Sequence, residues 1–498
     1  MKLRAFAGGR VWQKVFSFPV FLAVAIAACV FIFDSGSIAD PDIWWHLRNA
    51  EIFVQTHSVV HRDVYSFTAA GSRWINEAWL GELPYYFGWQ WLGIRGIYLV
   101  MLGETELILL GVYALACFSS KNAKAAFVAA APAVWLATVS FGPRTLLMGW
   151  ICLVVELYIL EQFRQGIDRS WWLVPLFVLW ANVHGSWLIG IVLFGVFVAA
   201  GLFDGDWGRL HSQRWTTSQL KKLSLVSALS VAGLFLNPYG YHLVFYPLDF
   251  AFKQKLNVAH VDEWVSLDFH SVRGKILFAM IAVTLLAALA RKRRWRVDEA
   301  AFLIVAFYAA VTYSRFLFLA AIVLTPMLAK ELDFIPNYRR ADDKTWLNVV
   351  LMIAIASACA WRFPSADHLL RDTVKTYPVN ASGYLRQFHP QGRVFNDFLW
   401  GGYLIWNYRD LPVFIDSRID IFEYNGVFAD YLDAIGVKNA LEILDKYNIR
   451  YVLFRRESPL TYLLMHNAGW KTDYEDGTTV LLEKVGPPPS TVAQVSAP

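Results

Sequence analysis

Carboxylate, imidazole and guanidinium side chains are concentrated in one short stretch, Asp40–Arg48, which reads DPDIWWHLR. A carboxylate there can take a proton from an attacking hydroxyl, and an arginine can bind an anion through two parallel hydrogen bonds. The stretch follows the first long apolar run, 16–33, almost at once and contains the pair Trp44 and Trp45. Tryptophan suits the headgroup level of a membrane, whereas acids are not needed for anchoring. We therefore predict that this loop carries the chemistry.

Charged side chains near the ends of the other apolar runs extend this set. Ionisable residues are costly at membrane depth and tend to mark pathways or sites. When these residues are sorted by the membrane face on which each loop is expected to lie, the outer face collects Asp40, Asp42, His46, Arg144, His184, Asp262, Glu263 and Arg315. We predict that these carboxylates and cations converge at the mouth of one outward-facing cavity.

The residue types in this set suit glycosyl transfer from a lipid phosphate. Asp40 or Asp42 would accept the proton of an acceptor hydroxyl as it attacks the anomeric carbon. The transition state resembles an oxocarbenium ion, so nearby carboxylates also stabilise it electrostatically. We assign binding of the substrate and its phosphate to His46, Glu77, Arg144, His184 and Arg315. Asp262 and Glu263 are secondary acids of another outer loop.

The composition indicates what holds these residues in place. The 498 residues are 57% hydrophobic and only 17% charged, with a mean hydropathy of +0.40, whereas soluble domains have about 25% charged residues. These values are typical of an integral membrane protein. The net charge of +5 is small and bears on membrane orientation rather than on nucleic-acid binding. No disulfide or metal spacing is visible, because all four cysteines lie inside apolar runs: Cys29, Cys117, Cys152 and Cys359.

Apolar runs long enough to cross a bilayer recur through the first part of the chain. About eleven candidates meet the criterion of roughly 20 mostly apolar residues: 16–33, 94–118, 123–141, 144–160, 171–182, 186–203, 220–236, 275–290, 297–312, 315–329 and 346–361. Lysine and arginine gather in alternate loops, which predicts a cytoplasmic N-terminus and an outer location for the residues after 361.

The sequence divides into three parts. Residues 1–363 are expected to form an α-helical polytopic membrane domain with outer-face loops at 34–93 and 237–274. From 364 to 485 the composition turns soluble, and short strands alternating with helices predict a small α/β domain on the outer side, with strands at 393–396, 412–415, 450–455 and 478–483. Residues 486–498 are rich in proline and serine and are predicted to be disordered.

Short motifs spread over nearly the whole chain carry a family resemblance. They are Asp40–Leu47, Asn76–Leu80, Asn182–Gly185, Leu236–Gly240, Gly401–Leu404 and Ile415–Asp420. Together with an acid directly after the first apolar run, they resemble the GT-C superfamily of polytopic glycosyltransferases, and a bacterial group within it. The resemblance implies a polyprenyl-phosphate-linked sugar donor, a glycan, lipid or protein acceptor, and an essential acid in the first outer loop.

The resemblance also raises the question of a metal, because some members of the superfamily use a divalent ion. Oxygen ligands from both outer loops would be needed, and here these would be Asp42 with Asp262 or Glu263. The spacing of these acids does not favour a metal, and we expect no cofactor.

Several candidate residues have simpler explanations. Asp40 would cap the helix that starts near Pro41, and the cations would be membrane anchors with partners in the bundle. Asp262 and Glu263 would form a solvated loop face.

Two further pairs of residues are ambiguous. For Asp416 and Arg418 we favour a structural ion pair over a ligand site. Glu104 and Glu106 lie inside an apolar run, where they either bond a neighbouring helix or line the cavity.

Two other functions are compatible with a polytopic chain of this kind. A transporter or flippase of a lipid-linked or anionic substrate would need polar residues through the full depth of the bundle and related halves. A non-catalytic scaffold for envelope glycan assembly would use its α/β domain to bind a partner. The charges collect on the outer face and no internal repeat is visible, which favours the enzyme.

Overall fold

A computed structural model describes residues 12–34 and 38–486, apart from the side chains of residues 251, 262 and 372. The chain forms two compact units. Unit 1 consists of Met1–Ser37, Leu80–Pro247 and Ala259–Ala366, and unit 2 of Ile38–Trp79, Leu248–Val258 and Asp367–Pro498. The tail that we predicted to be disordered, 486–498, lies outside the described residues from residue 487 onward.

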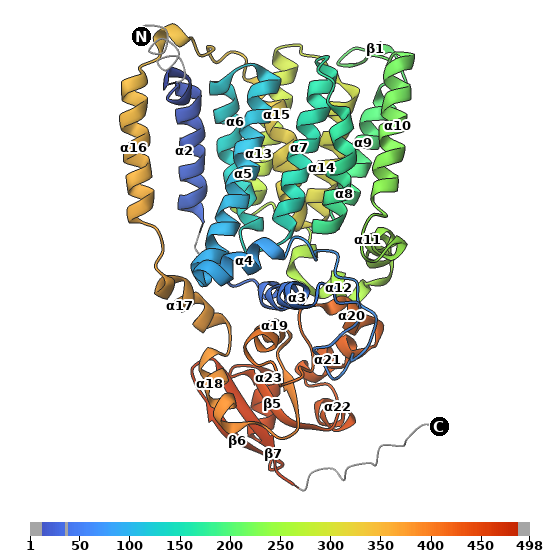
Figure 1. Ribbon diagram of the computed structural model, residues 1–498, viewed down its shortest axis with the longest axis vertical. Coiled ribbons are helices and arrows are strands. Elements are labelled where there is room, and N and C mark those ends of the chain that lie inside the picture. Colours follow the sequence, from blue (N-terminus) through green and yellow to red (C-terminus); the bar gives the residue numbers. More distant parts are fainter. Residues whose placement is uncertain (1–11, 35–37, 487–498) are drawn as a thin grey trace. The chain divides into compact units, whose positions relative to one another are not determined.

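Unit 1 is a bundle of long apolar helices that run side by side (Figure 1). Its helices are α2 (Phe18–Phe33), α4 (Leu83–Leu92), α5 (Ile94–Ser120), α6 (Ala123–Ala137), α7 (Leu146–Arg164), α8 (Leu173–Val183), α9 (Trp187–Ala200), α10 (Thr217–Gly233), α13 (Val272–Ala290), α14 (Val297–Thr312), α15 (Leu317–Glu331) and α16 (Thr345–Trp361). Short strands β1 (Gly205–Trp207), β2 (Leu210–Ser212) and β3 (Trp295–Arg296) form a small sheet among the connections.

Helix α15 lies in the interior of the bundle. Almost every residue of its sequence LFLAAIVLTPMLAKE is buried, and a helix that is hydrophobic all round must be covered on all sides. Two other helices of the bundle begin at sequence-encoded caps. Asn122 accepts hydrogen bonds from the backbone N–H groups of Lys124 and Ala125 at the start of α6, and Thr216 forms a capping box with Gln219 at the start of α10.

The expected count of about eleven spans is not confirmed. Among the described residues, four helices are long and apolar enough to cross a membrane, or five if one bent pair is counted as a single span: Ile94–Ser120, Ala123–Ser140, Leu146–Arg164, Val272–Ala290 and the bent pair Thr345–Trp361 with Ala366–Thr376. Most of the other predicted runs form shorter helices. The run at 171–182, for example, becomes the 11-residue helix α8, which is too short to span a bilayer by itself.

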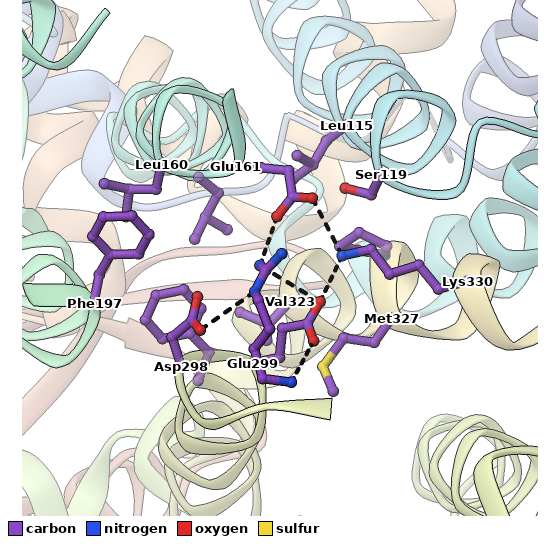
Figure 2. Close-up of a pocket in the computed structure, with 14 residues that line it drawn as sticks. Leu115, Ser119, Leu160, Glu161, Phe197, Asp298, Glu299, Val323, Met327 and Lys330 are labelled. Atoms are coloured by element: carbon purple, nitrogen blue, oxygen red, sulfur yellow. Dashed lines mark hydrogen bonds and ion pairs between the residues drawn. The ribbon is translucent and has the colours of Figure 1, made fainter. Parts of the chain in front are cut away.

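One end of the bundle is held together by a buried network of charges around a small cavity of about 50 Å³ (Figure 2). Arg296 Nη2 lies 2.6 Å from Glu161 Oε2, and Lys330 pairs with both Glu161 and Glu299. These residues belong to the ends of α7, α14 and α15 and to the residue before α14. Acids and bases alternate, so the network offers no uncompensated charge to a ligand, and we assign it a structural role.

Unit 2 combines part of the segment that we predicted to be the first outer loop with the C-terminal α/β region. Its elements are α3 (Asp42–Thr56), α18 (Val379–Phe388), β4 (Arg393–Asn396), α19 (Phe398–Asn407), α20 (Ile419–Tyr424), α21 (Val427–Ile435), α22 (Ala440–Lys446), β5 (Ile449–Arg455), α23 (Pro459–Met465), β6 (Trp470–Glu475) and β7 (Thr479–Lys484). The strands form one sheet in the order β4-β5-β7-β6, with β4 and β5 parallel and the other pairs antiparallel. Helices α19 to α22 lie in the crossover between β4 and β5, as a parallel pair requires.

Three helices lie where the segments of the two units alternate in sequence: α11 (Tyr241–Lys253), α12 (Lys255–His260) and α17 (Ala366–Thr376). Within unit 2, the segment 248–258 is bonded to α20. The backbone N–H groups of Leu256 and Asn257 donate to the carboxylate of Glu423 at 2.9 and 2.8 Å. Gln254, which is buried, donates to the carbonyl of Asp420.

Several predicted elements of unit 2 are confirmed. The helix expected to start near Pro41 is α3, which buries Ile43, Leu47 and Ala50, and three of the four predicted strands correspond to β4, β5 and β7. The strand predicted at 412–415 is wrong, because these residues make only an isolated bridge between Val413 and Ser66. Strand β6 was not predicted.

Candidate active site

Asp40 and Asp42 occupy different environments at the start of α3. Asp40 is buried, with 7% of its surface exposed, and its Oδ1 accepts a hydrogen bond from the backbone N–H of Asp42 at 2.9 Å. This is the capping role that Asp residues play before a helix. Asp42 is only half-buried, so of the two carboxylates it is the one that retains access to a substrate.

The Asp42 carboxylate is held by an indole from its own helix. Trp45 Nε1 lies 3.1 Å from Asp42 Oδ1 and 3.0 Å from Ser417 Oγ. One N–H group is therefore shared between the candidate base and a serine of the α/β region. Trp45 is 8% exposed, which fixes the indole and with it the direction of the bond.

Ser417 stands between the two members of a buried ion pair. Arg418 donates to Asp416 from Nε at 2.7 Å and from Nη2 at 2.6 Å, and its Nη2 also lies 2.6 Å from Asp63 Oδ1. Burial by itself would lower the pKa of Arg418, but the negative charges of Asp416 and Asp63 outweigh it and raise that pKa. The structural ion pair that we favoured for Asp416 and Arg418 is present, and the second acid, Asp63, was not predicted.

Two glycines allow α19 to lie close to the segment that carries Asp40 and Asp42. A side chain at Gly402 would place its Cβ 2.5 Å from the carbonyl oxygen of Pro41 and 3.2 Å from Trp45 Cδ1, and one at Gly401 would place its Cβ 2.3 Å from the carbonyl oxygen of Ile415. Such distances leave no room for a methyl group. The sequence motif at 401–404 is therefore explained by close packing of α19 against α3 and against the residues before Ser417.

Aromatic side chains also pack against α3. Trp44 packs edge to face on Tyr403 and Tyr377, with ring centroids 5.3 and 5.7 Å apart. Tyr377 donates a hydrogen bond of 2.9 Å to the carbonyl of Ala39. Burial, followed by the charge of Asp40, raises the pKa of Tyr377 above its ordinary value, which keeps the phenol neutral and able to donate.

In unit 1, the two candidate arginines are held by one short segment. Arg144 lies just before α7 and pairs with Glu263, and the two side chains are 31% and 30% exposed. Arg315 lies in the turn between α14 and α15, with its guanidinium 4.3 Å from the ring centroid of Trp264. The adjacent residues Glu263 and Trp264 thus position both cations, as a charge pair and as a cation–π contact.

Backbone contacts fix this segment to the bundle. Ser314 donates from its backbone N–H to the carbonyl of Val265 at 2.9 Å and from its hydroxyl to the carbonyl of Glu263 at 3.3 Å. The turn that carries Arg315 is therefore bonded directly to the segment that holds Arg144. Three sequence-predicted residues, Arg144, Arg315 and Glu263, are brought together in this way.

A buried acid connects the same end of the bundle to α4. Tyr85 donates to Glu104 Oε2 at 2.7 Å, and the tyrosine hydroxyl also lies 3.4 Å from the carbonyl oxygen of Arg144. Glu104 is 6% exposed. Of the two explanations left open for Glu104, hydrogen bonding between helices is the one observed. Tyr85 was not predicted.

The remaining candidates are placed as follows. His184 follows the last residue of α8, and its Nδ1 accepts a hydrogen bond from the backbone N–H of Ser186 at 2.9 Å, so a neutral ring carries its proton on Nε2. His46 is buried in α3, with its ring centroid 3.7 Å from that of Trp45. Glu77 is half-buried in the segment before α4. For Asp262, only the backbone is described.

The candidate residues divide between the two units. Asp40, Asp42, His46 and Glu77 belong to unit 2, whereas Arg144, His184, Arg315, Asp262 and Glu263 belong to unit 1. Their convergence in one cavity stays a prediction. Among the described residues, no group of three or more His, Cys, Asp or Glu side chains is arranged to hold a metal ion, and we derive no step through one.

Comparisons with known proteins identify the fold. No protein-family model matches the chain, and no curated protein matches its sequence. Solved structures do match. The oligosaccharyltransferase of Archaeoglobus fulgidus, determined with a tethered acceptor peptide containing an NVT sequon, superposes with a TM-score of 0.59 at 14% identity over 89% of this chain and 70% of its own.

Two further structures agree. AglB from Archaeoglobus fulgidus, in complex with an inhibitory peptide and a dolichol-phosphate, gives a TM-score of 0.53 at 13% identity, covering 96% of this chain and 74% of its own. Apo ArnT from Cupriavidus metallidurans gives 0.52 at 14% identity, covering 96% and 98%. These are membrane glycosyltransferases of the GT-C superfamily, so the resemblance seen in the sequence motifs is confirmed and the chain has the GT-C fold.

Proposed function

We propose that this protein is a membrane glycosyltransferase that moves a sugar from a polyprenyl-phosphate-linked donor to a glycan, lipid or protein acceptor. The proposed setting is the outer face of a bacterial inner membrane, with the N-terminus in the cytoplasm and the α/β region outside. Asp42 acts as the base, and Asp40 holds the first turn of α3 in which Asp42 lies.

The observation that carries the proposal is the fold shared with enzymes of this class over most of the chain. The archaeal structures contain an acceptor peptide in one case and a dolichol-phosphate in the other. An acceptor and a lipid phosphate carrier are the two kinds of molecule between which such a reaction transfers a sugar. The different exposures of Asp40 and Asp42 support the choice of base.

The reaction breaks the bond between the anomeric carbon and the phosphate oxygen and forms a bond from that carbon to the acceptor oxygen. Asp42 takes the proton that the acceptor hydroxyl loses. The electron pair of the broken bond leaves on the polyprenyl phosphate, which Arg144 and Arg315 bind. His184 donates a hydrogen bond from its Nε2–H to the same phosphate. Arg144 exchanges Glu263 for the phosphate on binding.

The test uses the purified full-length protein in nanodiscs with a panel of synthetic undecaprenyl-phosphate sugars. The panel includes a pentose, a hexose and an amino sugar, and the acceptors are lipid A, an oligosaccharide and a peptide mixture. Mass spectrometry identifies any product. We expect at least one donor to be consumed with release of undecaprenyl phosphate, and Asp42→Asn to reduce the rate by about a hundredfold or more.

Asp410→Asn is the matched control, because Asp410 is an exposed acid of the same unit. Full activity of Asp42→Asn would remove Asp42 as the base. Consumption of no donor would overturn the transferase, and passage of the intact lipid-linked sugar across a liposome membrane would identify a flippase in its place.

A further inference from the structure

We infer that Trp45 and Ser417 are positioning residues that orient the Asp42 carboxylate and set how readily it takes a proton. Trp45 acts through its indole N–H, which it donates to both Asp42 and Ser417, and Ser417 acts by competing with Asp42 for that N–H. The inference rests on the proposed role of Asp42 as base. It assigns a function in the reaction to the α/β region, which supplies Ser417 from the residues after α19.

The geometry is that of a three-centre hydrogen bond. The two acceptors, Asp42 Oδ1 and Ser417 Oγ, lie at nearly equal distances of 3.1 and 3.0 Å from the same nitrogen. A donor shared equally gives each acceptor less than a full bond. Trp45 therefore fixes the direction of the carboxylate, and Ser417 reduces the share of the indole N–H bond that the carboxylate receives.

Trp45, which donates the shared hydrogen bond, and Ser417, its second acceptor, are both rigidly placed. Asp416 and Arg418, which flank Ser417, are 0% and 3% exposed and are bonded to each other twice. The Trp45 ring packs edge to face on Trp74 at 5.6 Å, and Trp74 in turn lies under the guanidinium of Arg418 at 4.7 Å. A serine and an indole fixed in this way hold the shared bond at constant geometry.

The shared hydrogen bond predicts that loss of Trp45 and loss of Ser417 shift the titration of Asp42 in opposite directions. Removing the donor in Trp45→Phe takes a hydrogen bond from the charged carboxylate, so Asp42 titrates at higher pH. Removing the competing acceptor in Ser417→Ala leaves the N–H to Asp42 alone, so Asp42 titrates at lower pH and becomes a weaker base. A purely structural role for either residue predicts no such opposition.

The experiment measures the titration midpoint of Asp42 by carbon-13 NMR of the full-length protein labelled at aspartate Cγ, with Asp42→Asn to assign the signal. We expect a shift of about half a unit upward in Trp45→Phe and downward in Ser417→Ala. Ser417→Thr, which keeps the acceptor oxygen, should restore the wild-type midpoint. The other titratable groups of this region, Asp40, His46, Tyr377, Asp416 and Arg418, are retained in every variant.

Trp44→Phe is the matched control for loss of an indole from the same helix, since Trp44 packs on Tyr377 and Tyr403. It should leave the Asp42 midpoint in place. Shifts of the same sign in Trp45→Phe and Ser417→Ala, or no shift in either, would overturn the inference. Full turnover by Asp42→Asn would instead overturn the proposed base and the inference that depends on it, so the two failures are distinguishable.

Turnover is then measured with a donor that the nanodisc panel identifies. Trp45→Phe and Ser417→Ala should each lower kcat more than they raise KM. In plots of kcat against pH, the acid limb should move to higher pH in Trp45→Phe and to lower pH in Ser417→Ala, as the NMR midpoint does.

Discussion

Arg144 and Glu263 form an ion pair in which each side chain keeps almost a third of its surface exposed. Pairs of this exposure contribute only about 0–1 kcal/mol, because water screens the charges. An anionic ligand therefore needs little energy to take the place of Glu263. Under the proposed function, the pair would keep Arg144 in position before binding and release it when a phosphate arrives.

We predict that Glu263→Gln tightens binding of undecaprenyl phosphate by up to about fivefold, since it removes a competitor worth at most about 1 kcal/mol. Arg144→Gln should weaken binding about tenfold or more, because a charge-assisted bond to the phosphate is lost. Equilibrium binding of radiolabelled undecaprenyl phosphate to the protein in nanodiscs measures both. Asp268→Asn, at an exposed acid of the same loop, is the control. Equal affinity of the wild type and both variants would contradict a phosphate site at Arg144.

The buried cluster of Arg418, Asp416 and Asp63 should be essential to the stability of unit 2. Removing one partner of a buried ion pair leaves an uncompensated charge and costs about 3–5 kcal/mol. We therefore expect Arg418→Met, which leaves Asp416 and Asp63 without a countercharge, to lower the thermal midpoint of the full-length protein sharply in differential scanning fluorimetry. Lys438→Gln breaks a pair whose side chains are 71% and 46% exposed, and its midpoint should stay within a degree or so of wild type. A small effect of Arg418→Met would show that the cluster is dispensable.

Gly402 should not tolerate even a methyl group. In Gly402→Ala the new Cβ would meet the carbonyl of Pro41 at 2.5 Å, so α19 and α3 must move apart, at a cost of about 1–3 kcal/mol. We expect lower thermal stability together with loss of glycosyl transfer. Gly383→Ala is the matched control, since nothing lies within 4 Å of a Cβ at Gly383 in α18, and it should be neutral or stabilising. Similar behaviour of the two variants would refute close packing as the reason for Gly402.

Glu483 should make the stability of unit 2 depend on acid pH. Its hydrogen bond from Lys471, followed by those from Arg450 and Tyr451, lowers the pKa of Glu483 to about 2 despite some opposing desolvation. Because the folded-state pKa is below the unfolded value of about 4.3, this contribution is present above about pH 4.3 and is lost as the pH falls toward 2.

Chemical denaturation of wild type and Glu483→Gln measures this effect. The variant should be less stable at pH 6, and the difference should shrink between pH 4.3 and the lowest pH at which the protein stays folded. Glu475→Gln, at a more exposed acid of β6 paired with Arg456, is the control. A stability gap for Glu483→Gln that is constant with pH would contradict the lowered pKa.

The parts of the fold that follow local rules could be predicted from the sequence. The spacing of Ile43, Leu47 and Ala50 predicts the amphipathic helix α3, which is observed. β6 was missed because its sequence, WKTDYE, is mostly polar, which suits the edge position it occupies in the sheet. The number of spans was not confirmed because several apolar runs end after fewer residues than a bilayer requires, as α8 does before His184.

The candidate site could be predicted only in part, because its supports are distant in sequence. The motif containing Asp416 and Arg418 was recognised, but Asp63 is 355 residues from Arg418, and no local pattern connects them. The bond between Trp45 and Ser417 spans 372 residues and was missed for the same reason. The acids and arginines themselves were found because charged residues next to apolar runs are rare enough to attract attention.

The bond from Asp63 to Arg418 also has a consequence for biogenesis. The ribosome makes Asp63 early, and its cationic partner emerges only 355 residues later, an interval on the order of half a minute at typical elongation rates of ~5–20 residues per second. During that interval the nascent chain carries the Asp63 carboxylate without its countercharge, so this buried ion pair forms only after residue 418 has been made.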